Sequence, residues 1–192
     1  MRSDLDRWNA KYDSREPTSS IEPDDLLLEH EALLDSRGLC IDIAGGTGDN
    51  GLYLSRLGYE SVIVDGSETG LRLCACKARK NGLSPMLVVA DLDRFALPEA
   101  AFDVVLVFRY LNRDLIGPLR RCLKRNGVLF FKTFNRHHLE AHPRFPEEYV
   151  LKEGELTAWF SDLQCVATND GQATADTTYH WVGIATGSGN RG

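Results

Sequence analysis

The sequence has no apolar run long enough to cross a membrane, few cysteines and no excess of positive charge. Its first residues, Met1-Arg-Ser-Asp-Leu-Asp6, are too polar for a secretory signal, so neither a membrane span nor export is predicted. The 28 acidic residues outnumber the 22 basic ones, and a net charge of −6 argues against a general affinity for nucleic acid. We therefore expect a cytoplasmic protein.

The cysteines are too scattered for a disulfide framework. They are odd in number and all lie in apolar segments, which predicts reduced core thiols. The pair Cys74-Ala-Cys76 has no partner pair elsewhere, so we predict no metal site. The five are Cys40, Cys74, Cys76, Cys122 and Cys165.

One stretch organises the chain, from Leu39 to Gly51. Its first five residues have the alternation of a short buried strand, and four glycines follow within seven residues. Leu52 to Leu57 is then apolar at helical spacing and is followed by Gly58. A strand, a glycine loop and a helix together offer free backbone N–H groups to a nucleotide at the helix N-terminus.

Two kinds of nucleotide fit this stretch. Gly46-Thr-Gly-Asp-Asn-Gly51 matches the dinucleotide pattern G-x-G-x-x-G, which alone is weak evidence. Ala44 and Gly45 lengthen the turn before that pattern, and Asp42 places a carboxylate on a half-buried strand. A buried charge is costly unless it holds something, so Asp42 favours a different ligand from NAD.

Two further predicted strands also end on acids. The segment 61–65 ends at Asp65, roughly twenty residues after the glycine loop, where a carboxylate reaches the ribose of a bound nucleotide. The alternative for Asp65 is a helix cap, although Ser67 is available for that role. The segment 85–91 reads as a buried strand that ends at Asp91.

The pattern Asp42-x-Ala-x-Gly-x-Gly48 resembles motif I of the class I S-adenosylmethionine (SAM) methyltransferases, with Ala44 where a glycine is usual. The resemblance runs from about Trp8 to Ala185. It implies that the acid organises the loop and the methionyl end of SAM, that Asp65 holds the ribose, and that Asp91 and Leu92 meet the adenine. The implied cofactor-binding residues are Trp8, Asp42, Ala44, Gly45, Gly46, Gly48, Asp65, Gly66, Asp91, Leu92 and Phe108.

Candidate catalytic residues follow the fourth and fifth strands. Arg109 could bind an anionic acceptor or form a salt bridge. Tyr110 could accept a proton or only pack in the wall of the acceptor pocket. The loop 135–149 contains three histidines. His137 is the candidate for a catalytic base, and the other two are predicted to be surface residues. The segment 108–134 resembles a bacterial branch related to tellurite-resistance and thiopurine-type methyltransferases, although Lys132 stands where that branch has a glutamate.

The expected fold is α/β: a Rossmann-like doubly wound sheet, mostly parallel, with an antiparallel C-terminal hairpin. We expect one domain over residues 1–186, with a helical lid at 1–38, a SAM-binding core at 39–134 and a substrate-side loop with final strands at 135–186. Residues 187–192 are predicted to be a disordered tail. The remaining strands are expected at 39–43, 102–108, 128–134, 164–168 and 177–185, and helices at 4–12, 24–37, 67–81, 114–125 and 153–160.

These features predict a SAM-dependent methyltransferase that acts on a small molecule such as a thiol or a metalloid. The sequence lacks the Asn/Asp-Pro-Pro-Tyr turn that holds exocyclic amines after the fourth strand. Alternatives are an RNA or protein methyltransferase, with a local basic patch at 120–125, a non-catalytic SAM-binding subunit, and an NAD-linked oxidoreductase. The sequence lacks the catalytic Tyr-x-x-x-Lys pair that would support an oxidoreductase. The acceptor and the oligomeric state are not predicted.

Overall fold

The structure, a computed structural model, describes residues 2–34, 37–172 and 176–186, so the predicted tail at 187–192 lies outside it. The chain divides into two compact units, residues 1–95 and 96–192, which are described one at a time. Among the described residues, none of the helices is long and apolar enough to cross a membrane.

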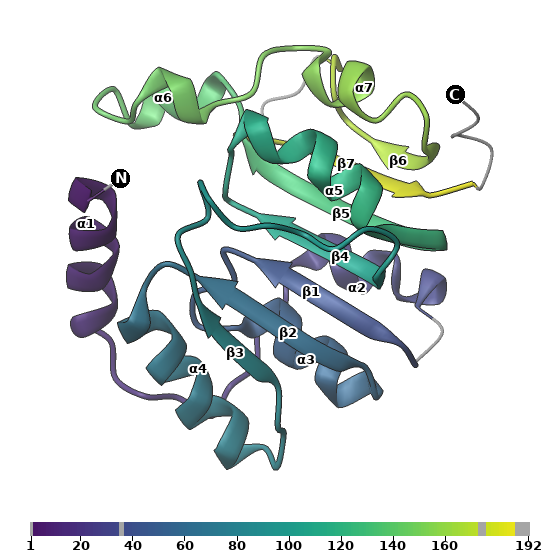
Figure 1. The fold of residues 1–192 in the computed structure, drawn as a ribbon. Coiled ribbons are helices and arrows are strands. Elements are labelled where there is room, and N and C mark those ends of the chain that lie inside the picture. The colour runs from purple at the N-terminus through teal and green to yellow at the C-terminus, as the bar shows by residue number, and fades with distance from the viewer. Residues whose placement is uncertain (1, 35–36, 173–175, 187–192) are drawn as a thin grey trace. The chain divides into compact units, whose positions relative to one another are not determined.

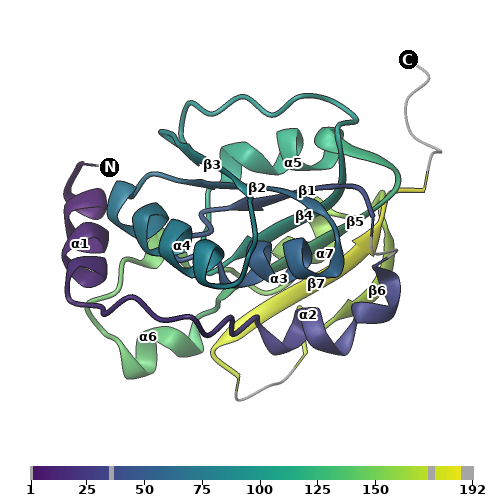
Figure 2. The ribbon, with the colours of Figure 1, turned by 90° about the horizontal axis from the view of Figure 1, so that it is seen from below.

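The first unit contains three parallel strands in the order β3-β2-β1 (Figure 1). They are β1 (Leu39–Ile43), β2 (Glu60–Asp65) and β3 (Met86–Val89). Parallel strands need crossover connections, and α3 (Asp49–Leu57) and α4 (Glu68–Lys80) supply them. Both helices lie on one side of these strands in Figure 2.

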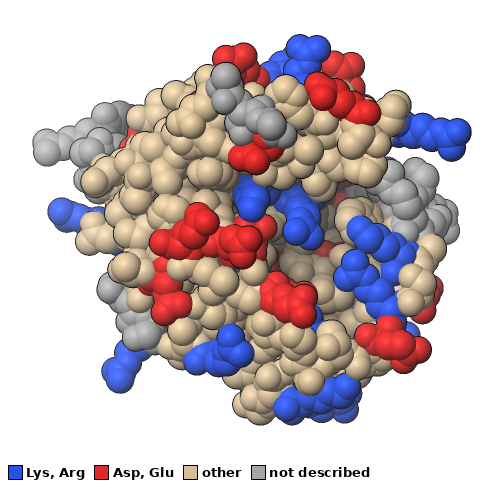
Figure 3. Space-filling view, turned by 180° about the vertical axis from the view of Figure 1, so that it is seen from behind, with Lys and Arg blue, Asp and Glu red and all other residues tan. Residues whose placement is uncertain are grey.

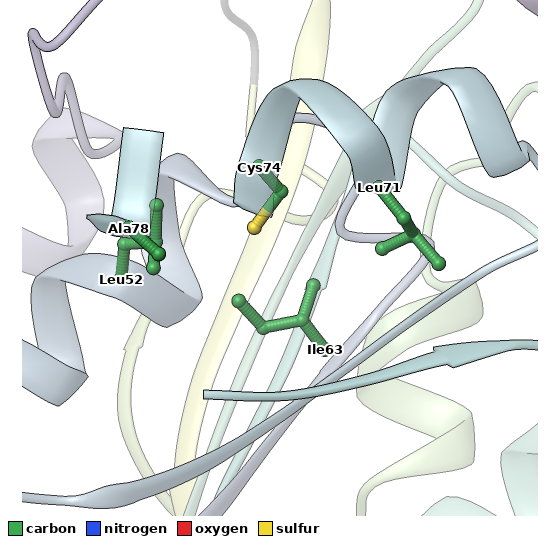
Figure 4. Close-up of a cluster of buried hydrophobic side chains, with 5 residues drawn as sticks. All are labelled: Leu52, Ile63, Leu71, Cys74 and Ala78. Atoms are coloured by element: carbon green, nitrogen blue, oxygen red, sulfur yellow. The ribbon is translucent and has the colours of Figure 1, made fainter. Parts of the chain in front are cut away.

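A buried cluster fixes these two helices on the strands (Figure 4). Leu71, Cys74 and Ala78 are three and four residues apart, so they share one face of α4. This face meets Ile63 of β2 and Leu52 of α3, and all five side chains are at most 4% exposed. The glycine loop between β1 and α3 therefore adjoins a tightly packed hydrophobic cluster.

Local signals place the ends of α3 and α4 where the sequence predicts them. The Ser67 hydroxyl caps α4 by accepting a 3.1 Å hydrogen bond from the Gly70 amide, and Gly58 ends α3 in the left-handed conformation. The helix α1 (Arg2–Asp13) lies against α4 (Figure 1).

Two expectations for the first unit were wrong. The helix expected at 24–37 is short: α2 (Asp25–Glu29) gives way to the 3-10 helix η1 (Glu31–Leu33), because His30 leaves helical geometry and its ring nitrogen bonds the Leu26 carbonyl at 3.0 Å. Strand β3 is not buried. It pairs only with β2 in this unit, and Met86 and Val89 are 63% and 57% exposed.

The second unit contains four strands in the order β4-β5-β7-β6. Strands β4 and β5 are parallel, whereas β5 with β7 and β7 with β6 are antiparallel, which confirms the predicted C-terminal hairpin. The strands are β4 (Phe102–Phe108), β5 (Leu123–Phe134), β6 (Gln164–Thr168) and β7 (Thr178–Ile184). The helical segments are η2 (Arg113–Leu115), α5 (Ile116–Cys122), α6 (His137–Ala141), η3 (Glu147–Tyr149) and α7 (Glu155–Trp159).

The second unit also corrects the sequence reading. The helix expected at 114–125 ends at Cys122, because Leu123 already pairs with Phe102 and begins β5. The segment 135–149 is not irregular throughout, since α6 forms where the His138 ring stacks on Phe134 with centroids 4.0 Å apart. Cys165 is exposed on the outer strand β6 and is therefore not a core thiol.

Candidate functional site

Asp42 ties the glycine loop to the strand that precedes it. Its side chain is 2% exposed, and its Oδ2 accepts a 2.9 Å hydrogen bond from the Gly51 amide in α3. Burial raises the pKa of Asp42 to about 7, because the charged form loses its solvation; the Gly51 hydrogen bond opposes this, and Asp65 adds to it. The strand carboxylate therefore organises the loop, as its position predicts.

The loop turns through three residues in the left-handed region. Ala44, Gly46 and Gly48 have φ of 57°, 54° and 78°, and the Gly48 amide closes the turn on the Gly45 carbonyl at 2.8 Å. A side chain at Gly48 would overlap the Cys74 sulfur of α4. The backbone thus needs glycine here for conformation and for space, while Ala44 carries a Cβ in a strained geometry.

Asp65 at the end of β2 bonds the same loop. Its Oδ2 accepts from the Gly46 amide at 2.8 Å and its Oδ1 from the Ser67 amide at 2.7 Å. Burial raises the pKa of Asp65, although these amides lower it. Asp65 therefore holds the loop and the start of α4, and Gly66 between them lies against Leu5 of α1.

The parallel register brings the three predicted acids to one edge of the first unit. Ile43 pairs with Val64 and Asp65 with Val89, so the strands end together. Asp91 follows two residues after β3, where it is exposed and accepts from the Asp93 amide at 3.1 Å. Its contact with an adenine stays a prediction, as does that of half-buried Leu92.

The helix α1 lies over this loop, and the contact of Trp8 with a cofactor stays a prediction. Trp8 stacks on Tyr12 with ring centroids 5.8 Å apart, while Tyr12 itself reaches Gly46 and Gly70. Asn9 accepts a 2.5 Å hydrogen bond from the Ser67 hydroxyl. Leu5, Trp8, Asn9 and Tyr12 follow helical spacing, which is the signal that could have identified the whole face.

A polar cavity of about 140 Å³ adjoins the glycine loop. Buried Lys77 of α4 pairs with Asp49 at 2.5 Å, and Asp49 also accepts from the Thr47 hydroxyl at 2.8 Å. Arg15 and Glu22 contribute further charges of both signs to the lining. Sequence reasoning missed this cavity, because its residues come from three separate segments.

The remaining predicted site residues lie in the second unit, where β4 ends. Phe108 is buried and pairs with Lys132 of β5. Arg109 is exposed with φ of 57°, and its amide donates a 2.7 Å hydrogen bond to the Lys132 carbonyl. Tyr110 follows, half-buried. The Arg109 guanidinium is therefore carried by a residue with a strained, left-handed backbone, and such strained residues are common at functional sites.

The histidines of α6 do not form the arrangement of a metal centre. The His137 ring lies 3.1 Å from a Glu140 oxygen, and the His138 ring lies 4.3 Å from that of His142, centroid to centroid. Burial and the neighbouring His142 lower the pKa of His138. Within the described ranges no group of three or more metal-binding side chains occurs. The base role of His137 stays a prediction.

Arg113, the other arginine after β4, is a structural residue. Its guanidinium bonds both Glu155 oxygens at 3.1 and 2.9 Å and the carbonyls of Glu148 and Val150 at 2.7 and 3.1 Å. It also lies over the Trp159 ring. Arg113 therefore holds the segment 148–159.

Residues 40–127 match a protein family described as "Methyltransferase domain". A curated relative, the ubiquinone/menaquinone biosynthesis C-methyltransferase UbiE of Azotobacter vinelandii, is 31% identical over 106 residues, which are 50% of this chain and 42% of that protein. The chain thus spans less than half the length of this curated relative.

Solved structures share the fold. TehB from Haemophilus influenzae has a TM-score of 0.68 at 16% identity and covers 92% of this chain and 65% of its own. A SAM-dependent methyltransferase from Aquifex aeolicus has a TM-score of 0.63 at 16% identity, with 97% and 99% covered. These comparisons confirm the predicted fold class and the resemblance to class I SAM-dependent methyltransferases, a family whose cofactor is SAM.

Proposed function

We propose that this chain is a class I SAM-dependent methyltransferase and that it methylates a small molecule. The observation that carries the proposal is the glycine loop held between the buried carboxylates of Asp42 and Asp65 within the matched residues 40–127. SAM supplies an electrophilic methyl group on a sulfonium. We also propose a cytoplasmic location.

The residues of the first unit fit this cofactor. The glycine loop follows the carboxyl end of β1, a parallel strand, and nucleotides bind at such strand ends in α/β sheets. Asp65 has lone pairs left to accept from ribose hydroxyls. The cavity beside Thr47 offers the cations Arg15 and Lys77 and the anions Asp49 and Glu22, which suits a zwitterionic amino-acid group. The helix α1 then serves as a lid.

On the acceptor side, Arg109 is the group that we assign to binding. A guanidinium presents paired donors to an anionic acceptor and cannot act as a base at neutral pH. Tyr110 and His137 are the remaining candidates for a proton acceptor, which an amine or a hydroxyl needs and a thiolate does not. A thiol or a metalloid oxyanion is therefore the acceptor class that we test first.

An RNA acceptor is disfavoured by the surface charges. The basic patch at 120–125 is largely neutralised: Arg120 pairs with Asp162, Arg121 with Glu99 at 3.3 Å and Lys124 with Asp103 at 2.7 Å. Acidic and basic side chains are also interspersed on the face shown in Figure 3. Counterion release by phosphate contacts, the main source of affinity for RNA, needs cations without such partners.

The experiment that tests the cofactor is calorimetric titration with SAM, S-adenosylhomocysteine and NAD. We expect micromolar binding of both adenosyl ligands, no binding of NAD, and strongly weakened binding to the Asp65→Ala variant. Binding of NAD alone would favour an oxidoreductase. Unchanged affinity in Asp65→Ala would remove that carboxylate from the site.

Transfer of labelled methyl from SAM to thiols, metalloid oxyanions, RNA and protein then tests the acceptor. We expect turnover with a small molecule. Tight SAM binding without turnover on any of these classes would instead favour a non-catalytic SAM-binding subunit.

A further inference from the structure

Strand β3 presents an open edge of apolar residues. It is the outermost strand of the first unit (Figure 1), and within the described residues of this unit it pairs only with β2. The Ala90 amide donates to the Asp65 carbonyl at 3.0 Å, so alternate residues back from Ala90 direct their backbone groups to β2. The amides and carbonyls of Leu87 and Val89 therefore point away from β2.

Charges and bulges, two features that usually protect such an edge from pairing with another chain, are missing from β3. Residues 86–90 contain no charged side chain, and the pairing of β3 with β2 has an unbroken register. Met86 and Val89 are the two most exposed large hydrophobic side chains among the described residues. By contrast, β6, the outer strand of the second unit, has a register shift at Val166.

Apolar surface continues beside this edge. A groove of about 480 Å³ adjoins the amino end of β3, and Leu83, Met86 and Val62 are among its lining residues. Burial of exposed apolar surface is the main driving force of protein association. An occupant of the edge therefore gains hydrophobic contact as well as backbone hydrogen bonds.

The charges at the two ends of β3 are opposite. Exposed Arg79 and Lys80 lie in the last turn of α4, just before the strand, and exposed Asp91 and Asp93 follow it. Arg94 lies 4.0 Å from Asp91 and offsets part of the acidic end. An antiparallel second copy of β3 brings each basic end beside an acidic end, whereas a parallel copy brings like charges together. The charge pattern of this edge is therefore complementary to itself under a two-fold rotation.

We propose that the β3 edge pairs with the β3 edge of a second copy of this chain, antiparallel and across a two-fold axis. With Val88 opposite the partner's Val88 on the axis, Leu87 of each copy lies opposite the partner's Val89. Each of these pairs can exchange both backbone hydrogen bonds. Pro85 has no amide donor and limits the ladder at its amino end. Because the same surface is used twice, the assembly closes as a dimer. The inference does not depend on the cofactor or the acceptor.

The test is the mass of the protein in solution, measured by sedimentation equilibrium over a range of micromolar concentrations. We expect a mass that approaches twice the 21.4 kDa of one chain as the concentration rises. Val89→Lys places a charge on the edge of both copies, so this variant should stay at the mass of one chain. Its melting temperature under dilute conditions should match that of the wild type, because the Val89 side chain is mostly exposed in the single chain.

Val166→Lys is the matched control. It makes the same substitution at an exposed valine on β6, the other outer strand, and it should dimerise like the wild type.

Hydrogen exchange locates the interface without any substitution. The amides of Leu87 and Val89 should become more protected as the concentration rises, and those of β6 should not change. A charge exchange tests the direction of pairing. Lys80→Glu and Asp93→Lys should each raise the dissociation constant of the dimer about 2- to 10-fold, and the double variant should recover most of this loss.

Two results would overturn the inference. One is a wild type that keeps the mass of a single chain at the highest concentration, which would leave the edge to a strand of a different protein. The other is a dimer that persists in Val89→Lys and forms without a change in exchange at β3, which would place the interface elsewhere.

Discussion

The amide of Gly51 and the carboxylate of Asp42 are joined by a 2.9 Å hydrogen bond across the glycine loop. Asp42 is the penultimate residue of β1 and Gly51 lies in the first turn of α3, so a single buried carboxylate sets the span of the loop. Because burial raises the pKa of Asp42 from 3.8 to about 7, against the effect of this hydrogen bond, the buried carboxyl group makes folding depend on pH.

We predict that the Asp42 proton makes the protein less stable as pH rises from 4 to 7. In this window the native state holds the proton and the unfolded state does not, so the free energy of unfolding falls as pH rises. The contribution is on the order of 4 kcal/mol across the window. Urea denaturation of wild type and Asp42→Asn from pH 4 to 8 measures it. In Asp42→Asn the free energy of unfolding should not show this fall with pH. Parallel plots of the free energy of unfolding against pH for the two proteins would contradict the prediction.

Ala44→Gly should stabilise the protein. Ala44 has φ of 57°, which is unfavourable for a residue with a Cβ, and glycine removes that strain while it adds entropy to the unfolded chain. We expect a net gain of about 0.5–1 kcal/mol in urea denaturation. Ala100→Gly is the control, since exposed Ala100 has φ of 47°. A gain at position 100 alone would mean that the Ala44 methyl packs favourably.

Gly48→Ala should destabilise the protein by about 2 kcal/mol or more, because the new Cβ meets the Cys74 sulfur and φ is 78°. Cys74→Ala removes the sulfur, so the double variant should lose less than the two single changes added together. A double-mutant cycle of urea midpoints measures this coupling. Additive losses would mean that the backbone conformation alone excludes alanine.

Arg113→Lys should cost about 1–2 kcal/mol and open residues 148–155 to proteolysis. Lysine keeps the charge but cannot bond two carbonyls and both Glu155 oxygens together. Arg121→Lys serves as the control, because its pair with Glu99 is exposed on both sides and such pairs contribute little. Limited proteolysis with mass spectrometry locates the cleavage, and equal behaviour of both variants would refute the role of Arg113.

Arg109→Ala should spare SAM affinity and lower turnover by about 10-fold or more, once an acceptor is known. Alanine keeps the Cβ and the left-handed strain, so the change isolates the guanidinium. Arg125→Ala, also exposed and in the same unit, should leave both quantities unchanged. Equal losses of affinity and turnover at Arg109 would indicate a structural role.

Most of the first unit could be predicted from local patterns. The β-branched run to Asp65, the cap at Ser67 and the glycine at 58 mark element ends through short-range chemistry, and each is where the sequence places it. Asp42 was predicted as a functional residue because a charge on a half-buried strand is costly without a partner, and Asp65 because it ends a strand about twenty residues after the glycine loop. Their partners in the structure include the amides of the loop itself, which spacing alone does not reveal.

Two of the errors come from contacts distant in sequence. The helix predicted to reach residue 125 ends at Cys122 because Leu123 pairs with Phe102, and β3 is exposed because it pairs only with β2 in its unit. Trp8 and Tyr12 share one helix face, and only the placement of α1 shows that Tyr12 is the one that reaches Gly46 and Gly70.

The sequence by itself determined the strand–loop–helix unit, the acids that end its strands and the α/β class, because these follow from hydrophobic period, glycine and capping, which act over a few residues. The tertiary structure decided which aromatic meets the loop, which cations are already paired and where a charged cavity forms. Those outcomes depend on side chains brought together from distant segments, and burial and pairing have no local signature in the chain.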